Sequence, residues 1–189
     1  MKYSAIWISC MLLAIAATPL SAQSRRNNFY ARSLAPYVPS PPHIVERMLE
    51  IAQLKPGETV YDLGCGDGRI LIAAVKHFRA KAVGVELSDQ LATSTEQKIA
   101  SLGLQNDARV IHGDLLDVDL SPANVVTIYL MTESNDKLRP NLERELKPGA
   151  RVVSHDYSVP GWKPNLVEKA EGNSRAHLIY LYVMPPTRQ

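Results

Sequence analysis

Cysteine and phenylalanine are scarce in this chain of 189 residues, which contains two of each. Cys10 lies in an apolar N-terminal run and Cys65 in a glycine-rich turn, so we expect neither an intramolecular disulfide nor a cysteine metal site. With 46% hydrophobic residues, a chain of this length can bury one core of ordinary size. It has no room for a second domain.

A large excess of one charge is also absent. The formal net charge is +2, and the basic residues are scattered along the sequence. Sequence-independent binding to nucleic acids depends on clustered Lys and Arg, so we expect no nucleic-acid partner. No cluster of Asp and Asn suggests a divalent ion, and we expect no metal site.

The most informative part of the chain is Val60–Ile70, with the sequence VYDLGCGDGRI. It predicts a buried strand, a glycine-rich turn and the start of a helix. Gly64, Gly66 and Gly68 permit positive φ and let a ligand approach the backbone, while free N–H groups at the helix start point toward that ligand. We therefore expect a cofactor site at this turn.

The spacing of the glycines distinguishes between cofactors. They follow the pattern GxGxG, whereas dinucleotide-binding turns have the pattern GxGxxG. Asp62 lies two residues before the first glycine, where its carboxylate would suit a cationic group and repel a pyrophosphate. The pattern therefore favours S-adenosylmethionine over NAD.

The next two predicted strands also end in acids. The segment Lys81–Glu86 places at its end the carboxylate of Glu86, which can accept hydrogen bonds from both hydroxyls of a ribose. The segment Arg109–Asp114 ends in Asp114, which together with Leu115 could contact an adenine. In an open parallel sheet, ligands bind beyond the carboxyl ends of the strands, so these side chains are expected beside the glycine turn.

These residues resemble the class I, Rossmann-like methyltransferases that use S-adenosylmethionine. Further segments are similar to the small archaeal broad-specificity protein lysine methyltransferases and, more distantly, to the mitochondrial lysine methyltransferases of eukaryotes. The segments are PYVPSP at 36–41, VERML at 45–49, DLGCGDGRI at 62–70 and VVSH at 152–155. The resemblance spans roughly residues 36–184. It implies an enzyme that methylates lysine side chains of protein substrates, with S-adenosylmethionine as cofactor.

The expected fold is α/β, a three-layer Rossmann-like methyltransferase sheet that is mostly parallel with an antiparallel edge strand. Residues 166–171 and 177–184 are expected to pair antiparallel at that edge. Only ten residues separate His155 from Leu166, and they include prolines, so the usual helix after the fifth strand is expected to be shortened or absent.

Proline and serine predict two helix starts. Ser40 is expected to cap a helix whose first turn holds the prolines of residues 41–42. Pro140 is expected to begin a helix before the fifth strand.

Methyl transfer from a sulfonium depends mainly on alignment, since positioning alone can supply effective molarities of about 10⁵ M or more. A lysine must first lose its proton, and an apolar or aromatic channel lowers the pKa of the amine. We therefore expect aromatic residues at the strand ends and assign no catalytic acid or base. The candidates for the substrate channel are Tyr37, Tyr129, His155, Tyr157 and Trp162. Trp162, in a loop with Gly and Pro, is the preferred candidate.

Two other functions stay open, a small-molecule N- or O-methyltransferase and a non-catalytic cofactor-binding module. Nucleic-acid bases are disfavoured as substrates. The fourth predicted strand ends in Tyr129-Leu130-Met131-Thr132, without the Asn/Asp-Pro-Pro-aromatic tetrapeptide that holds an exocyclic amine. The chain also lacks the Pro-Cys pair that methylates cytosine.

The N-terminus has the layout of a secretory signal: Lys2, the apolar run Ala5–Ala17 and small residues ending at Ala22. The apolar run is shorter than the about 20 residues of a membrane span. We interpret residues 1–22 as a signal peptide or membrane anchor. Residues 23–35 are interpreted as a linker and residues 36–189 as the methyltransferase domain.

A signal peptide implies a periplasmic or secreted protein. Arg25 and Arg26 favour an alternative, an anchored enzyme that faces the cytoplasm and touches the membrane only through its N-terminal segment. A mis-assigned start codon would instead make the protein cytoplasmic. The sequence leaves the oligomeric state open.

Overall fold

The computed structural model describes residues 36–172 and 175–188, which belong to the compact unit Arg32–Gln189. The predicted signal peptide or anchor and the linker lie outside the described residues. Among those described, no helix is both long and apolar enough to cross a bilayer.

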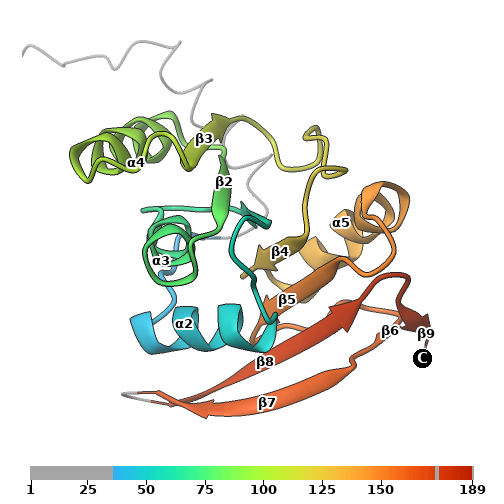
Figure 1. Cartoon of the computed structure of the whole chain (residues 1–189). Helices are drawn as coiled ribbons and strands as arrows, with labels where there is room; N and C mark the ends of the chain where they lie inside the picture. The colour runs from blue at the N-terminus through green and yellow to red at the C-terminus, as the bar shows by residue number, and fades with distance from the viewer. Residues whose placement is uncertain (1–35, 173–174, 189) are drawn as a thin grey trace, which may run out of the picture. The chain divides into compact units, whose positions relative to one another are not determined.

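The centre of the fold is a seven-stranded sheet with the order β3-β2-β1-β4-β5-β8-β7 (Figure 1). Its strands are β1 (Thr59–Leu63), β2 (Lys81–Glu86), β3 (Ala108–His112), β4 (Val125–Ile128), β5 (Arg151–His155), β7 (Leu166–Glu171) and β8 (Ala176–Val183). The first five are parallel to one another, and β8 is antiparallel to both β5 and β7. The predicted α/β fold is confirmed, with the antiparallel strand second from the edge.

Helices cover the two faces of the sheet unequally (Figure 1). One face carries α2 (Pro42–Ile51), α3 (Arg69–Phe78) and α4 (Asp89–Ser101), and the other carries α5 (Thr132–Glu145). After β5, residues 156–165 are all described and contain only turns, bends and the short strand β6 (Trp162–Lys163), which pairs with β9 (Thr187–Arg188). The expected loss of the helix after the fifth strand is confirmed.

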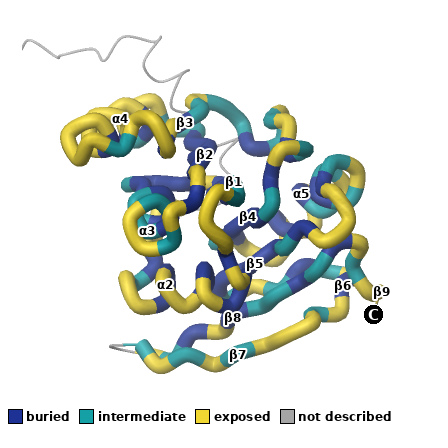
Figure 2. The backbone as a smooth tube through the Cα atoms, in the orientation of Figure 1, coloured by how far each residue is buried: buried dark blue, intermediate teal, exposed yellow. Residues whose placement is uncertain are grey.

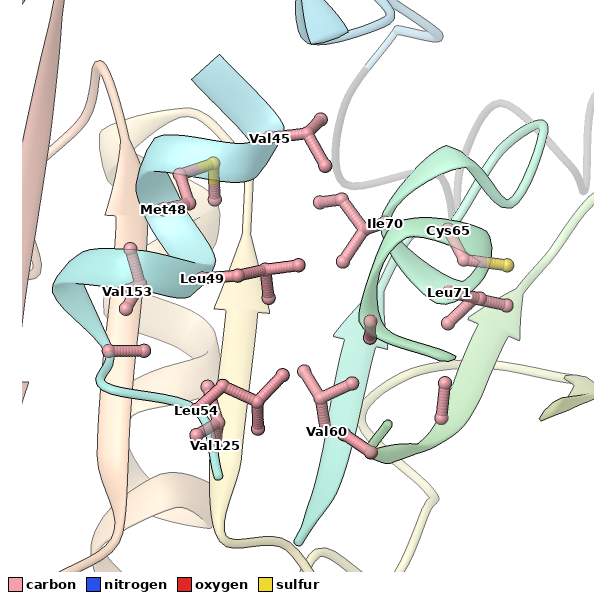
Figure 3. Packing of buried hydrophobic residues seen from close by; sticks show 14 of the residues in the cluster. Val45, Met48, Leu49, Leu54, Val60, Cys65, Ile70, Leu71, Val125 and Val153 are labelled. Carbon is pink, nitrogen blue, oxygen red and sulfur yellow. The ribbon is translucent and has the colours of Figure 1, made fainter. Parts of the chain in front are cut away.

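Aliphatic side chains build the core between the helices and the sheet. Figure 3 shows Met48 and Leu49 of α2 and Leu71 of α3 packed over Val60 and Val125 of the strands. The apolar residues of α2 follow the helical period, so one face of the helix is buried while the other is exposed (Figure 2). This packing fixes the strand ends where the site forms.

The predicted helix start at Pro140 is wrong, and so is the predicted cap at Ser40, although Pro42 does lie in the first turn of α2. Pro140 lies inside α5, where it removes one helical hydrogen bond. The fully buried Leu138 and Leu142 flank it and pack both halves of the helix against the sheet, which compensates for that loss. Ser40 does not cap α2, whose N-cap is Pro41, because the Ser40 hydroxyl bonds a histidine of β5 instead.

Candidate active site

The glycine turn after β1 has the predicted backbone conformation. The φ values are +86° at Gly64, +52° at Gly66 and +72° at Gly68. The N–H groups of Gly64 and Cys65 donate to the carbonyl of Val85 at 2.9 and 3.0 Å, which anchors the turn to β2. A Cβ on Gly64 would meet only a Leu130 methyl, at 3.8 Å, so the turn leaves room for a ligand.

Glu86 lies at the end of β2 beside this turn. One carboxylate oxygen accepts the N–H of Gly66 at 2.9 Å, and the other accepts the N–H of Ser88 at 2.8 Å. Glu86 therefore holds the turn against the start of α4, a structural task that its sequence position did not indicate. Each oxygen can accept a further bond, so binding of ribose hydroxyls by Glu86 remains a prediction.

Asp62 is a buried carboxylate beneath the turn, with 5% of its surface exposed. Burial raises the pKa of Asp62 to about 7, although a hydrogen bond from Thr127 at 2.8 Å acts in the opposite direction. No Lys, Arg or His of the described residues pairs with it. A buried carboxylate needs a cationic partner, so this position fits the ammonium group expected of the cofactor.

Asp114 is the third of the predicted strand-end acids, and it lies further along the edge formed by the carboxyl ends of the strands. Asp114 follows β3 and accepts the N–H of Leu116 at 3.0 Å. Leu115 is buried and belongs to the same apolar cluster as Val85 of the neighbouring strand. The structure thus places both residues one strand beyond Glu86, and their contact with an adenine remains a prediction.

A strap formed by residues 36–41 lies over the glycine turn. A Cβ on Gly66 would come within 2.5 Å of the ring of Tyr37. Arg69 fixes the strap, because its guanidinium donates to the carbonyl of Ser40 at 2.6 Å and to Asp67 of the turn at 2.9 and 2.7 Å. Sequence analysis missed Arg69, because its partner in the strap, Ser40, lies 29 residues away in the sequence and leaves no spacing signal.

The structure brings Tyr129, His155 and Tyr157 together at the ends of β4 and β5. The ring of Tyr129 lies 3.9 Å from that of His155 and 6.2 Å from that of Tyr157, measured between centroids. The Tyr129 hydroxyl donates to Asp156 at 3.0 Å. Burial, followed by this bond, raises the pKa of Tyr129 to about 12. These aromatic residues occupy the edge where the substrate channel is predicted.

His155 is fully buried and takes part in a hydrogen-bonded chain. Its Nδ1 lies 2.8 Å from the Ser40 hydroxyl, and its Nε2 lies 2.8 Å from Nδ1 of His177. Burial lowers the pKa of His155 to about 4, so the ring is neutral at pH 7. His155 therefore supports Tyr129 and the strap, and its contact with a substrate in the channel remains a prediction.

Three side chains of this cluster have the donor types of a metal site. Ligand atoms of His155, Asp156 and His177 lie within 4.8 Å of one another. However, the Asp156 oxygen that faces the histidines already accepts hydrogen bonds from Arg175 at 2.5 Å and from Tyr129. A guanidinium and a phenol therefore take the place that a metal would need, and we assign the cluster to hydrogen bonding.

The expectation that Trp162 contacts substrate is wrong. Its side chain is fully buried, with the indole N–H donating to Glu143 at 2.7 Å and the ring 5.4 Å from that of Tyr182. The surrounding Gly and Pro residues indicated an exposed loop. Because no helix follows β5, Trp162 instead fills space beside the sheet that such a helix would cover.

His155→Gln is expected to remove a loss of stability that acid causes in the wild type. Between pH 6.5 and pH 4, the unfolded chain binds a proton at this residue that the folded chain does not, so stability falls as the pH drops. The loss is on the order of 3 kcal/mol at pH 4 and absent above pH 7. Urea unfolding at pH 7 and pH 5 should show a smaller decrease for the variant than for the wild type. The exposed His77→Gln serves as control, and identical decreases in the wild type and His155→Gln would contradict this account.

Glu86→Ala is expected to weaken both cofactor binding and the fold. Removing the carboxylate leaves the N–H groups of Gly66 and Ser88 without their acceptor. Affinity for S-adenosylmethionine should fall by about 1–3 kcal/mol, the range for a charged hydrogen-bond partner. Calorimetric titration measures the affinity, and Glu96→Ala on the surface of α4 is the matched control. Unchanged affinity in Glu86→Ala would refute the placement of Glu86 in the cofactor site.

A family model described as the ANTKMT methyltransferase domain matches residues 62–166 of this chain. The chain belongs to this family of methyltransferases. It is 49% identical to a protein-lysine N-methyltransferase of Saccharolobus islandicus, over 79% of this chain and 93% of the relative. It is 33% identical to the adenine nucleotide translocase lysine N-methyltransferase of Mus musculus, over 82% of this chain and 67% of that protein.

A solved structure agrees with the fold of this methyltransferase. A crystal structure described as an RNA methyltransferase from Salinibacter ruber in complex with S-adenosyl-L-homocysteine superposes with a TM-score of 0.75. The two sequences are 38% identical, and the match covers 78% of this chain and 94% of the Salinibacter ruber chain. The predicted membership in the Rossmann-like methyltransferases is confirmed, as is the resemblance to protein lysine methyltransferases.

Proposed function

We propose that this methyltransferase transfers methyl groups from S-adenosylmethionine to lysine side chains of proteins. The observation that carries the proposal is the 49% identity to a protein-lysine N-methyltransferase across nearly all of that relative. The site supports it independently. A buried carboxylate with no cationic partner among the described residues lies under a glycine turn that is open at Gly64, and aromatic rings lie at the neighbouring strand ends.

The residues divide into a cofactor side and a substrate side. On the cofactor side, Asp62 would hold the ammonium group and Glu86 the ribose hydroxyls, while the N–H groups of the turn approach the ligand. When bound, S-adenosylmethionine supplies a methyl group that moves from its sulfur to the neutral lysine nitrogen, so that one C–S bond breaks as one N–C bond forms. On the substrate side, Tyr129 and Tyr157 provide aromatic walls that exclude water and align the amine. The proton lost from the lysine beforehand passes to water.

The test is a transfer assay with the full chain and radioactive S-adenosylmethionine. Lysine-rich histone proteins serve as substrates, and a digest is analysed for methyl-lysine by mass spectrometry. We expect label in methyl-lysine with the wild type and none with Gly66→Val. Label on a small amine alone, or no transfer to any lysine, would overturn the proposal.

The name of the Salinibacter ruber structure makes RNA the second substrate to test. The net charge of +2 and the scattered basic residues argue against it, since RNA-binding surfaces usually carry clustered Lys and Arg. The same assay with total RNA in place of histone should therefore give no labelled nucleotide. Labelled RNA together with unlabelled histone would move the assignment to an RNA methyltransferase.

A further inference from the structure

Asp156, the residue directly after β5, has an unusual backbone conformation. Its φ is +61°, in the left-handed region that residues other than glycine seldom adopt. Such residues cost free energy and cluster at functional sites. The backbone N–H of Leu178 donates to one carboxylate oxygen at 3.0 Å and fixes the carboxylate, so that the other oxygen faces the Tyr129 hydroxyl.

Arg175, from the connection between β7 and β8, lies on this second oxygen. A single guanidinium nitrogen donates to Asp156 at 2.5 Å and to the Tyr129 hydroxyl oxygen at 3.2 Å. The Arg175 side chain is 53% exposed, whereas that of Asp156 is 11% exposed. With the residues that the structure describes, Arg175 makes one further hydrogen bond, to the carbonyl of its chain neighbour Ala176 at 3.1 Å. Arg175 is thus a surface side chain that reaches down to a largely buried carboxylate.

Another arginine of this protein shows how a structural ion pair differs. Arg151 and Glu58 are joined through two nitrogens, and their side chains are only 17% and 18% exposed. Arg151 also donates to the carbonyl of Ala52 and so ties three segments together. Arg175 lacks comparable enclosure, and it can leave Asp156 without disturbing the core.

The place that Arg175 occupies has the chemistry of a binding site for an ammonium group. It offers a carboxylate oxygen, a phenol oxygen and the adjacent ring of Tyr157, and these groups bind cations through charge-assisted hydrogen bonds and through the ring face. It also lies on the correct edge. β5 is two strands from β1, which places Asp156 about 10 Å from the glycine turn, with Tyr129 directly after β4, the strand between.

We propose that Asp156 and Tyr129 form the subsite that receives the amino group of the acceptor lysine, and that Arg175 fills this subsite when no substrate is bound. The proposal rests on the proposed function. An incoming lysine displaces Arg175 into solvent and takes over its contacts. The carboxylate then faces the positive charge that the lysine nitrogen regains as it accepts the methyl group, which favours the transition state.

The experiment compares Arg175→Met and Asp156→Asn with the wild type in the full chain. Met keeps an unbranched side chain without the charge, and Asn tolerates positive φ. The readouts are KM for a lysine-containing peptide and the inhibition constant of n-butylammonium, with 1-butanol as the neutral analogue. Arg188→Met, an exposed arginine paired with Glu143, is the matched control.

We expect Arg175→Met to lower KM and the butylammonium inhibition constant by about 3- to 10-fold, since a competing cation has gone. Asp156→Asn should raise both by about 10-fold or more, because a charged partner is lost. Arg188→Met and 1-butanol should show no such change. Unchanged or higher constants in Arg175→Met, with unchanged melting temperature, would overturn the proposal. If that variant melts early, Arg175→Gln is used in its place.

Failure of the proposed function would be visible separately. If the wild type methylates no lysine, butylammonium binding is followed by NMR titration in the presence of S-adenosyl-L-homocysteine. Tighter binding to Arg175→Met than to the wild type, and weaker binding to Asp156→Asn, would still support the cation subsite. Equal binding to all three proteins would refute it whatever the enzyme's substrate is.

Discussion

Gly66→Val is expected to lower the affinity for S-adenosylmethionine by about 100-fold or more, because it adds backbone strain and a steric clash to the same turn. Gly66 has a φ of +52°, which a β-branched residue adopts only as an outlier. Its Cβ would lie 2.5 and 3.0 Å from two ring carbons of Tyr37. Either the strap or the turn must move, and the turn would then lose its bond to Glu86.

The measurement is calorimetric titration with S-adenosylmethionine, with circular dichroism to confirm that the fold persists. Gly103→Val is the matched control, since Gly103 has a φ of +72° and no neighbouring atoms within 4 Å of a built Cβ. It carries similar backbone strain away from the site and should bind cofactor normally. Near-normal affinity in Gly66→Val would remove the basis for placing the cofactor at this turn.

The cofactor side of the site could be predicted from the sequence because its signals are local. Asp62 and the glycines follow one another in a single strand–turn–helix unit, and their spacing alone defines the conformation. Glu86 was found because parallel strands place their carboxyl ends along one edge of the sheet. The sequence does not predict that Glu86 also holds the turn in place, because that role depends on the direction in which the N–H groups of Gly66 and Ser88 point.

The substrate side could not be predicted in full because its residues meet through long-range pairing. Asp156 and His177 lie on segments that become neighbours only when β8 adds antiparallel to β5, with His155 opposite Ile179. No local spacing indicates that register, and Arg175 lies just before β8. The sequence therefore yielded the aromatic residues at the strand ends and missed the charged residues beside them.

Burial at the thinly covered face of the sheet was also beyond sequence reasoning. A loop containing Gly and Pro predicts an exposed side chain, whereas Trp162 is fully buried. The loss of the helix after β5 was predicted correctly, but its consequence was not. When a helix is missing, the sheet still requires an apolar cover, and a large side chain from the connecting loop supplies it.

Trp162→Ala is consequently expected to act on stability and to spare cofactor binding. Removing this buried indole leaves a cavity beside Tyr182 and deletes the hydrogen bond to Glu143. The free energy of unfolding should fall by about 3–5 kcal/mol, the usual cost of a buried Trp→Ala change. That is a large part of the about 5–15 kcal/mol that stabilises a typical domain.

Urea unfolding at 15 °C measures this loss, and calorimetric titration at the same temperature should give a wild-type affinity for S-adenosylmethionine in the folded fraction. The matched variant is Tyr157→Ala, whose exposed ring lies at the predicted channel. It should keep most of the stability, because an exposed ring buries little apolar area, and lower turnover on lysine substrates. The opposite pattern, in which Trp162→Ala folds with normal stability and loses turnover, would return Trp162 to the substrate channel and contradict the packing described for it.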